Sequence, residues 1–261
     1  MKKQAKVSLV NWTPKPIETM CWSRRVMHSP VPDSVNDIDF DSHKWLGMSV
    51  DDYFNKILLH DGMPTFLEYV NFTFKLENVS RALQQQLTRH RIGFSYSIQS
   101  LRCIDLPNFA DDCAYFNPYE DGSDANIDYH NSMLEVQESY RKALKSGVAT
   151  QDARGLLPMN LYSTVTFHCS LRSLIGMISK RMCLKTQGEF RTVADQIVSA
   201  IINKVDSRLA TYFKPPCARG KCMMEAENNE QYEKGLLEGK QNTDHICPIY
   251  LKKFVKKGDS E

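Results

Sequence analysis

The residues best suited to chemistry lie in segment 89–102, which reads RHRIGFSYSIQSLR. Three adjacent basic side chains open the segment, and Arg102 closes it after a run of serine and tyrosine hydroxyls. Neighbouring cations repel one another unless an anion lies between them, and the forked guanidinium group matches the geometry of a phosphate. Because charged runs are also common on solvated turns, the segment taken alone fits either a binding site or a surface turn.

The residues that precede this segment favour a binding site. Residues 69–76 alternate between apolar and polar, which predicts a strand with Phe72 and Phe74 on one buried face. Residues 78–87 have the pattern of a capped helix. We therefore expect the arginines to lie at the end of an ordered strand–helix unit.

Further arginines lie at or near the ends of predicted elements. Any single one is typical of surface charge, but several of them together suit a ligand that carries phosphates and a planar polar base. A nucleotide or dinucleotide has that chemistry. The chain has neither a dinucleotide glycine fingerprint nor a P-loop, so side chains would hold the phosphates. The residues concerned are Arg89, Arg91, Arg102, Arg154, Arg172 and Arg181, flanked by Gln86, Ser95, Ser97 and Ser100.

Two other kinds of chemistry are weaker alternatives. Ser100 could act as a nucleophile with His90 as its base, but no local acid is placed to orient the histidine, and a serine more often hydrogen-bonds a phosphate. A zinc site is the second alternative, although neither of its residue pairs has the usual two-residue spacing, and a reduced tail is favoured instead. The zinc ligands would be Cys217, Cys222, His245 and Cys247.

Length and composition describe an ordinary globular protein. The 261 residues suffice for one large domain or two small ones, and a net charge of +2 gives no general attraction to nucleic acid or to an acidic membrane. No apolar run approaches the roughly 18 residues of a membrane span. The first residues lack a signal-peptide core, so we expect a cytoplasmic protein whose eight cysteines stay reduced.

Hydrophobic periodicity and turn residues give the order of elements. An antiparallel or mixed sheet packed with helices, an α+β fold, is expected over residues 1–213, followed by a polar, cysteine-containing tail over 214–261. The expected strands are 6–11, 69–76 and 161–169. The expected helices are 17–27, 49–60, 78–87, 132–146, one that starts near 171 and a long one that ends near 213, with loops over 30–45 and 107–128.

Several separated blocks resemble the flavin-dependent thymidylate synthases. The resemblance covers about residues 6–213, and the blocks agree with the family in order and in spacing. The matching segments are 10–14, 65–74, 79–81, 86–91, 95–97, 99–102, 151–162, 171–174, Arg181 and 187–191.

The resemblance implies the reductive methylation of dUMP to dTMP in a homotetramer, with active sites at the subunit junctions. Each site would use FAD, methylene-tetrahydrofolate as the carbon donor and NADPH as the reductant, with no partner among nucleic acids or membranes. No enzyme nucleophile is required, in agreement with the weak case for Ser100 in that role. The cofactor would carry the hydride chemistry, and the arginines would supply position and electrostatic field.

Site residues follow from the resemblance by position. The implied cofactor-binding residues are Tyr69, Arg89, His90, Arg91 and Arg172. The implied residues for dUMP are Gln86, Ser100, Leu101, Arg102, Arg154 and Arg181. Of these, Arg181, toward the uracil, and Ser100 are the catalytic candidates.

The chain departs from the family at a few positions. Eight residues separate Arg91 from Ser100, one more than usual, and we place the extra residue at Gly93-Phe94 because glycine can absorb a bulge. Ile98, Cys103 and Tyr69 also replace residues that are usual in the family, and Ser170 and Gly176 stand where asparagines are usual. These changes leave open a relative that makes another 5-substituted dUMP, such as 5-hydroxymethyl-dUMP. The basic segment and the tail leave open a nucleotide- or nucleic-acid-binding protein without turnover, although the acidic loop over 107–128 and the small net charge count against nucleic acid.

Overall fold

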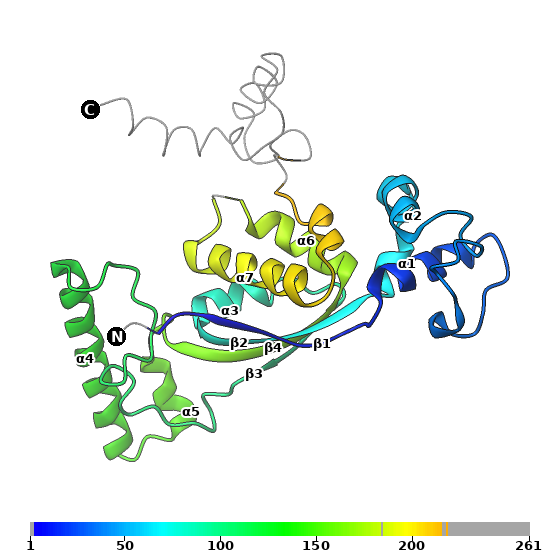
Figure 1. Ribbon diagram of the computed structural model, residues 1–261. Coiled ribbons are helices and arrows are strands. Elements are labelled where there is room, and N and C mark those ends of the chain that lie inside the picture. The colour runs from blue at the N-terminus through cyan, green and yellow to red at the C-terminus, as the bar shows by residue number, and fades with distance from the viewer. Residues whose placement is uncertain (1–2, 184, 216–217, 219–261) are drawn as a thin grey trace, which may run out of the picture. The chain divides into compact units, whose positions relative to one another are not determined.

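The computed structural model describes residues 3–183, 185–215 and 218 (Figure 1). The chain divides into a sheet unit, residues 1–12 and 72–169, and a helical unit, residues 13–71 and 170–261. The residues proposed as zinc ligands lie outside the described part, as does nearly all of the expected tail. Among the described residues, no helix has both the length and the apolar character needed to cross a membrane.

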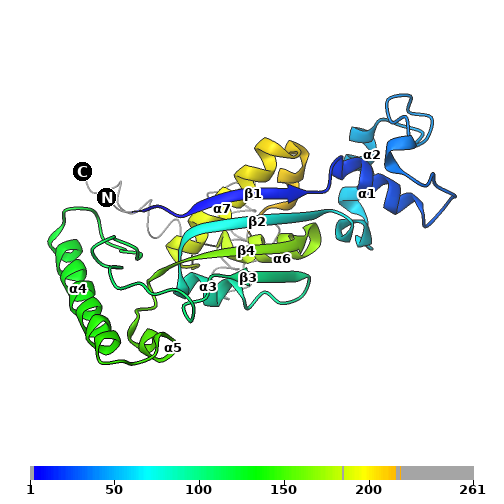
Figure 2. The ribbon, with the colours of Figure 1, turned by 90° about the horizontal axis from the view of Figure 1, so that it is seen from below.

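The sheet unit is built on four strands in the order β1-β2-β4-β3 (Figure 2). The pairs β1/β2 and β3/β4 are antiparallel. Thr73 of β2 contacts His168 of β4, and just beyond the two strands the backbone N–H of Arg81 donates to Leu161, so β2 and β4 also run in opposite directions. The fold is therefore α+β, as expected. The strands are β1 Lys6–Trp12, β2 Asn71–Ser80, β3 Phe94–Ile98 and β4 Tyr162–Ser170.

Aromatic side chains fill the buried face of the sheet. Phe72 and Phe74 of β2 are fully buried, as the alternating pattern predicts. The ring of Phe167 on β4 stacks on Phe74 with 5.3 Å between the ring centroids, and it also packs against Phe94 of β3 at 6.0 Å. Packing on this face therefore joins three strands and fixes β3, which immediately follows the basic turn of residues 88–93.

Helix α3, Arg81–Leu87, begins three residues later than expected. The expected start at residue 78 is wrong because β2 continues to Ser80, whose hydroxyl oxygen accepts the backbone N–H of Leu83 at 3.0 Å as the N-cap. Helix α4, Asp124–Lys145, in contrast begins before the expected residue 132. Its N-cap is Ser123, within the segment expected to be a loop. Strand β3 was not expected from the sequence.

The helical unit contains helices from both ends of the chain. Helix α6 contacts α7 and the short 3-10 helix η3, and η3 also contacts α1. The buried stripe of α6 includes Leu171, Leu174 and Ile178 and leaves Arg172 exposed. The helices of this unit are α1 Pro16–Arg25, η1 Val35–Asp37, α2 Val50–Lys56, η2 Leu58–His60, η3 Thr65–Glu68, α6 Leu171–Arg181, α7 Gly188–Lys204 and η5 Ser207–Tyr212. Two short helices, α5 Thr150–Ala153 and η4 Arg154–Leu156, belong to the sheet unit.

Candidate functional site

The basic turn, residues 88–93, joins α3 to β3 and is held by one tyrosine. The hydroxyl of Tyr96 on β3 lies 2.9 Å from the carbonyl oxygen of Leu87 and 2.7 Å from that of His90, and it donates to both. Burial raises the pKa of Tyr96 far above its usual range, so the hydroxyl stays protonated and remains a donor. Arg89 and Arg91 are exposed on either side of the half-buried His90. The backbone of this turn is thus held in place, and it carries two exposed arginine side chains.

Gly93 gives this turn its shape. Its φ of 71° lies in the left-handed region, where a residue with a Cβ is strained. The placement of the extra residue at Gly93-Phe94 stays a prediction; in the structure Phe94 is already the first residue of β3, and its pairing with β4 is regular. The preceding Ile92 is 91% exposed, so the turn extends into solvent.

Gln151 brings two of the expected substrate-binding arginines together. Its side-chain oxygen accepts a hydrogen bond from Nη2 of Arg102 at 3.2 Å, and its backbone oxygen accepts one from Nε of Arg154 at 2.9 Å. Gln151 lies in α5, one helical turn before Arg154. A neutral amide residue therefore holds two cations without cancelling their charge.

Arg81 adds a third cation to this group, which we call the arginine cluster: Arg81, Arg102 and Arg154. Burial lowers the pKa of Arg81, and the nearby charge of Arg154 lowers it further. Its Nη1 atom is buried and has no hydrogen-bond partner among the described residues. None of the three arginines forms a salt bridge within the part of the chain that the structure describes. A phosphate dianion supplies the charge and the acceptors that such a cluster lacks.

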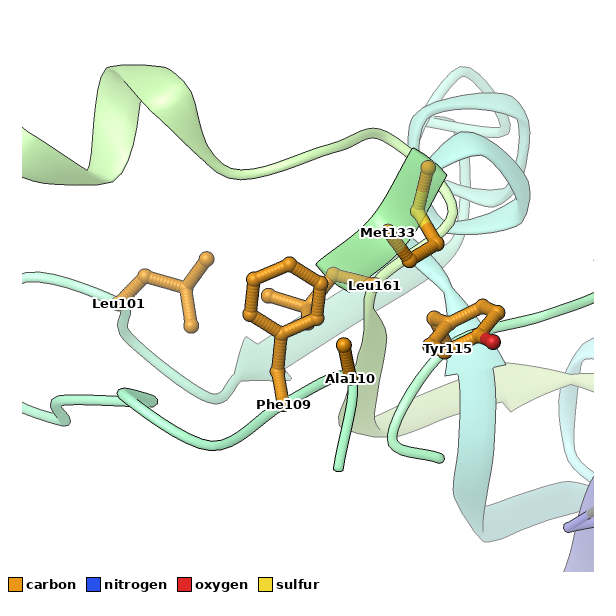
Figure 3. Close-up of a cluster of buried hydrophobic side chains, with 6 residues drawn as sticks. All are labelled: Leu101, Phe109, Ala110, Tyr115, Met133 and Leu161. Carbon is orange, nitrogen blue, oxygen red and sulfur yellow. The ribbon is translucent and has the colours of Figure 1, made fainter. Parts of the chain in front are cut away.

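Leu101 anchors the loop that carries Ser100 and Arg102. Its side chain is 5% exposed and belongs to a hydrophobic cluster, so only its backbone remains for a ligand contact. The Ser100 hydroxyl oxygen accepts the backbone N–H of Arg102 at 3.2 Å, which closes the loop above this cluster. The cluster, shown in Figure 3, consists of Leu101, Phe109, Ala110, Tyr115, Met133 and Leu161.

The helical unit holds the remaining candidates. Tyr69 is 53% exposed, and its ring is held edge-on by Trp22, with 6.4 Å between the centroids. Arg172 lies in the first turn of α6, where Glu68 is 3.6 Å from its Nε atom. Arg181, at the end of α6, places its guanidinium carbon 4.5 Å from the ring centroid of the buried Phe190. A cation over an aromatic face is stabilised by the ring quadrupole, so this contact orients Arg181.

The candidates thus form two groups, one in each unit. The sheet unit holds Gln86, the basic turn, Ser100, Leu101 and the arginine cluster, and the helical unit holds the other three. Arg81, Gln151 and Glu68 were not among the residues expected at the site. The first two had recognisable signals: Arg81 directly follows the N-cap of a helix, and Gln151 precedes Arg154 by one helical turn. No cluster of three potential metal ligands occurs among the described residues.

Fold and geometry define an α+β protein with a cationic site suited to a phosphate-bearing ligand. The family model described as "Thymidylate synthase complementing protein" matches residues 8–205. Similar proteins include the flavin-dependent thymidylate synthase of Clostridium tetani, 30% identical over 237 residues, with 83% of this chain and 90% of the relative covered. That of Pyrococcus abyssi is 30% identical over 210 residues, covering 78% and 81%.

Solved structures share the fold. The UMP/dUMP methylase PolB from Streptomyces cacaoi, bound with 5-Br dUMP, superposes with a TM-score of 0.59 at 21% identity, covering 81% of this chain and 95% of that one. Thymidylate synthase X from Helicobacter pylori, with FAD and dUMP, gives 0.57 at 18% identity, covering 80% and 97%. The chain belongs to the flavin-dependent thymidylate synthase family, which confirms the resemblance found in the sequence.

Proposed function

We propose that this protein catalyses the reductive methylation of dUMP to dTMP, with methylene-tetrahydrofolate as the carbon donor, FAD as the hydride carrier and NADPH as the reductant. Membership of the flavin-dependent thymidylate synthase family supports the reaction class. The arginine cluster is the observation that carries the proposal to this chain, because three guanidinium groups that pair with no carboxylate of the described residues suit an anionic ligand.

The arginine cluster would bind the phosphate of dUMP. Gln151 keeps Arg102 and Arg154 at hydrogen-bonding distance from one residue, which reduces the rotamer freedom that each loses when the phosphate binds. The buried Nη1 of Arg81 would gain the acceptor that it lacks. Ser100 and Gln86 are further candidates for contacts with the sugar and phosphate. The chain's own residues would therefore bind and orient the nucleotide, and none needs to act as a nucleophile.

The residues expected at the cofactor fit FAD in their chemistry. Arg89, Arg91 and Arg172 are exposed cations suited to a diphosphate, and Tyr69 exposes an aromatic ring suited to a planar ring system. His90 lies in the turn that Tyr96 holds in place. When bound, FAD supplies hydride transfer, a reaction that no protein side chain performs.

Arg181 would contact the uracil ring, and its contact with Phe190 supports this role. The aromatic face restricts the guanidinium to a small range of directions, and the N–H groups of a guanidinium can donate to carbonyl oxygens such as those of uracil. We expect Arg181→Ala to lose dUMP binding and to keep flavin binding. Equal dUMP affinity in Arg181→Ala and the wild type would contradict the assignment.

The experiment that tests the function begins with the purified full-length protein and its flavin absorbance. A colourless protein that takes up no added FAD would refute a flavin enzyme. With FAD bound, oxidation of NADPH should require both dUMP and methylene-tetrahydrofolate, and mass spectrometry should identify dTMP as the product. The same preparation, measured by light scattering, tests the proposed homotetramer.

A flavin enzyme that makes another 5-substituted dUMP is the second candidate, and two positions favour it. Ser170 donates its hydroxyl to Glu68, and Gly176 is exposed with no atom near the position of a Cβ. Neither residue offers the amide that is usual at these positions in the family. A product heavier than dTMP by one oxygen atom would identify 5-hydroxymethyl-dUMP and support this alternative.

A further inference from the structure

The carboxylate of Glu68 joins two residues at the start of α6. Its Oε2 atom accepts a hydrogen bond of 2.7 Å from the hydroxyl of Ser170, and its Oε1 atom lies 3.6 Å from Nε of Arg172. Glu68 ends η3, and Ser170 is the N-cap of α6. One carboxylate thus contacts both the cap of the helix and the expected flavin-binding arginine in its first turn.

The start of α6 is fixed by backbone as well as by side chains. The backbone N–H of Leu171 donates to the carbonyl oxygen of Val70 at 2.7 Å, and the Ser170 hydroxyl oxygen accepts the backbone N–H of Ser173 at 3.4 Å. The backbone of Arg172 therefore has a defined position. What remains variable is the direction of its long side chain, and Glu68 is the charged group that contacts it.

The pair formed by Glu68 and Arg172 is too exposed to contribute much to the stability of the fold. Their side chains are 47% and 50% exposed, and ion pairs of this kind have small effects on stability. At 3.6 Å the contact is also longer than a hydrogen bond, so it does not consume a donor of the guanidinium group. The carboxylate of Glu68 therefore orients the Arg172 side chain, and the N–H donors of the guanidinium group are left for a ligand.

We propose that Glu68 is a positioning residue for flavin binding: anchored by Ser170, its carboxylate holds the Arg172 guanidinium in the direction that meets the anionic part of FAD. This inference rests on the proposed role of Arg172. By restricting Arg172 before binding, Glu68 reduces the conformational entropy that is lost when the cofactor binds. Glu68 acts on the cofactor only through Arg172.

A double-mutant cycle tests this dependence. Glu68→Gln keeps the shape of the side chain and an acceptor for Ser170 but removes the charge. We expect it to raise the dissociation constant of FAD, measured by flavin fluorescence on the full-length protein, by about three- to fivefold, the size of an exposed ion-pair effect. In the Arg172→Ala background the same change should have no effect. Glu77→Gln, which alters a carboxylate paired with Lys75 and Lys6, is the matched control and should leave FAD affinity unchanged.

The outcomes separate the inference from the function on which it rests. If Arg172→Ala weakens FAD binding but Glu68→Gln does not, the positioning role is wrong and the role of Arg172 stands. If Arg172→Ala binds FAD like the wild type, the assignment of Arg172 fails and the positioning role fails with it. Equal losses from Glu68→Gln in both backgrounds, accompanied by a lower melting temperature, would show a purely structural role and overturn the inference.

Discussion

Arg81 and Arg154 lie close enough together that the charge of Arg154 lowers the pKa of Arg81. Two cations in this arrangement destabilise the ligand-free protein, and the buried Nη1 of Arg81 adds the cost of an unpaired donor. A fold under no functional constraint would gain by replacing either residue. This unfavourable arrangement supports the proposal that the two arginines bind an anion, and the experiments below test it.

Replacement of Arg81 by methionine should separate binding from stability. Arg81→Met keeps an unbranched apolar side chain and removes the unpaired donor, so the ligand-free protein should melt at the same temperature or about 2–4 °C higher. The dissociation constant of dUMP should rise about tenfold or more, since a charge-assisted hydrogen bond is lost. Differential scanning calorimetry and isothermal titration measure the two effects.

Arg141→Met is the matched control for this experiment. Arg141 donates to the carbonyl oxygen of Pro107 and to the side chains of Asn108 and Asp111, each at 2.7 Å. Its replacement should lower the melting temperature and leave dUMP affinity unchanged. If Arg81→Met behaved like this control, Arg81 would be structural and the arginine cluster would not be the phosphate site.

A carboxylate at position 151 should compete with the phosphate, because it would be within hydrogen-bonding distance of Arg102, at 3.2 Å in the present side chain. Glu68, in contrast, lies 3.6 Å from Arg172, too far to take up a hydrogen-bond donor. In Gln151→Glu the side chain keeps its length but places a negative charge beside Arg102 and next to Arg154. We expect a slightly more stable ligand-free protein and a dUMP affinity about tenfold lower at low salt, with a smaller loss at high salt because these groups are exposed. Gln151→Ala, which adds no charge, should weaken dUMP binding less. Unchanged affinity in Gln151→Glu would place the phosphate elsewhere.

The sequence predicted the cationic residues but not the way they meet. Arg102 and Arg154 were recognisable because both lie near the ends of elements, yet their common contact, Gln151, depends on where α5 lies relative to the loop that follows β3. Sequence separation carries no information about that contact. Arg81 was also missed, because its unpaired Nη1 atom is a consequence of burial in the folded chain.

The element boundaries that were misjudged have a common local cause. Both α3 and α4 begin directly after a serine N-cap, Ser80 and Ser123, whereas the helices expected over 78–87 and 132–146 place neither serine at the cap. Strand β3 was missed because its five residues FSYSI are flanked by the basic turn and a loop, and its identity depends on pairing with β4. Pairing of this kind is a property of the tertiary fold and not of local propensity.

Ser100→Ala should distinguish a binding role from a nucleophilic one. The hydroxyl oxygen accepts the backbone N–H of Arg102, so its loss should loosen the loop and raise the KM for dUMP several-fold. Steady-state kinetics should show kcat within about tenfold of the wild type. A loss on the order of 10⁴-fold or more in kcat, with dUMP still bound, would restore Ser100 as the nucleophile.

The pH dependence of stability should reveal the contribution of the ion pair between Asp206 and Arg208, near the end of the described part of the helical unit. Burial raises the pKa of Asp206, but hydrogen bonds from the side chain and backbone of Arg208 outweigh this and bring the pKa below its usual value. Nη2 of Arg208 is 2.6 Å from Oδ2 of Asp206, and its Nε is 2.9 Å from Oδ1. The pair fixes the start of η5, for which Asp206 is the N-cap.

A carboxyl whose pKa is lower in the folded state stabilises the fold above its unfolded pKa, about 3.9, and loses this contribution as the pH falls through the folded value. Asp206→Asn should therefore reduce the free energy of unfolding at pH 7 by about 1–3 kcal/mol, the range for hydrogen bonds to a charged group. The difference between variant and wild type should shrink below about pH 4. Urea denaturation at pH 7 and pH 3.5 measures the difference in free energy of unfolding between variant and wild type. If this difference is equal at both pH values, the carboxylate charge contributes nothing and the effect arises from packing alone.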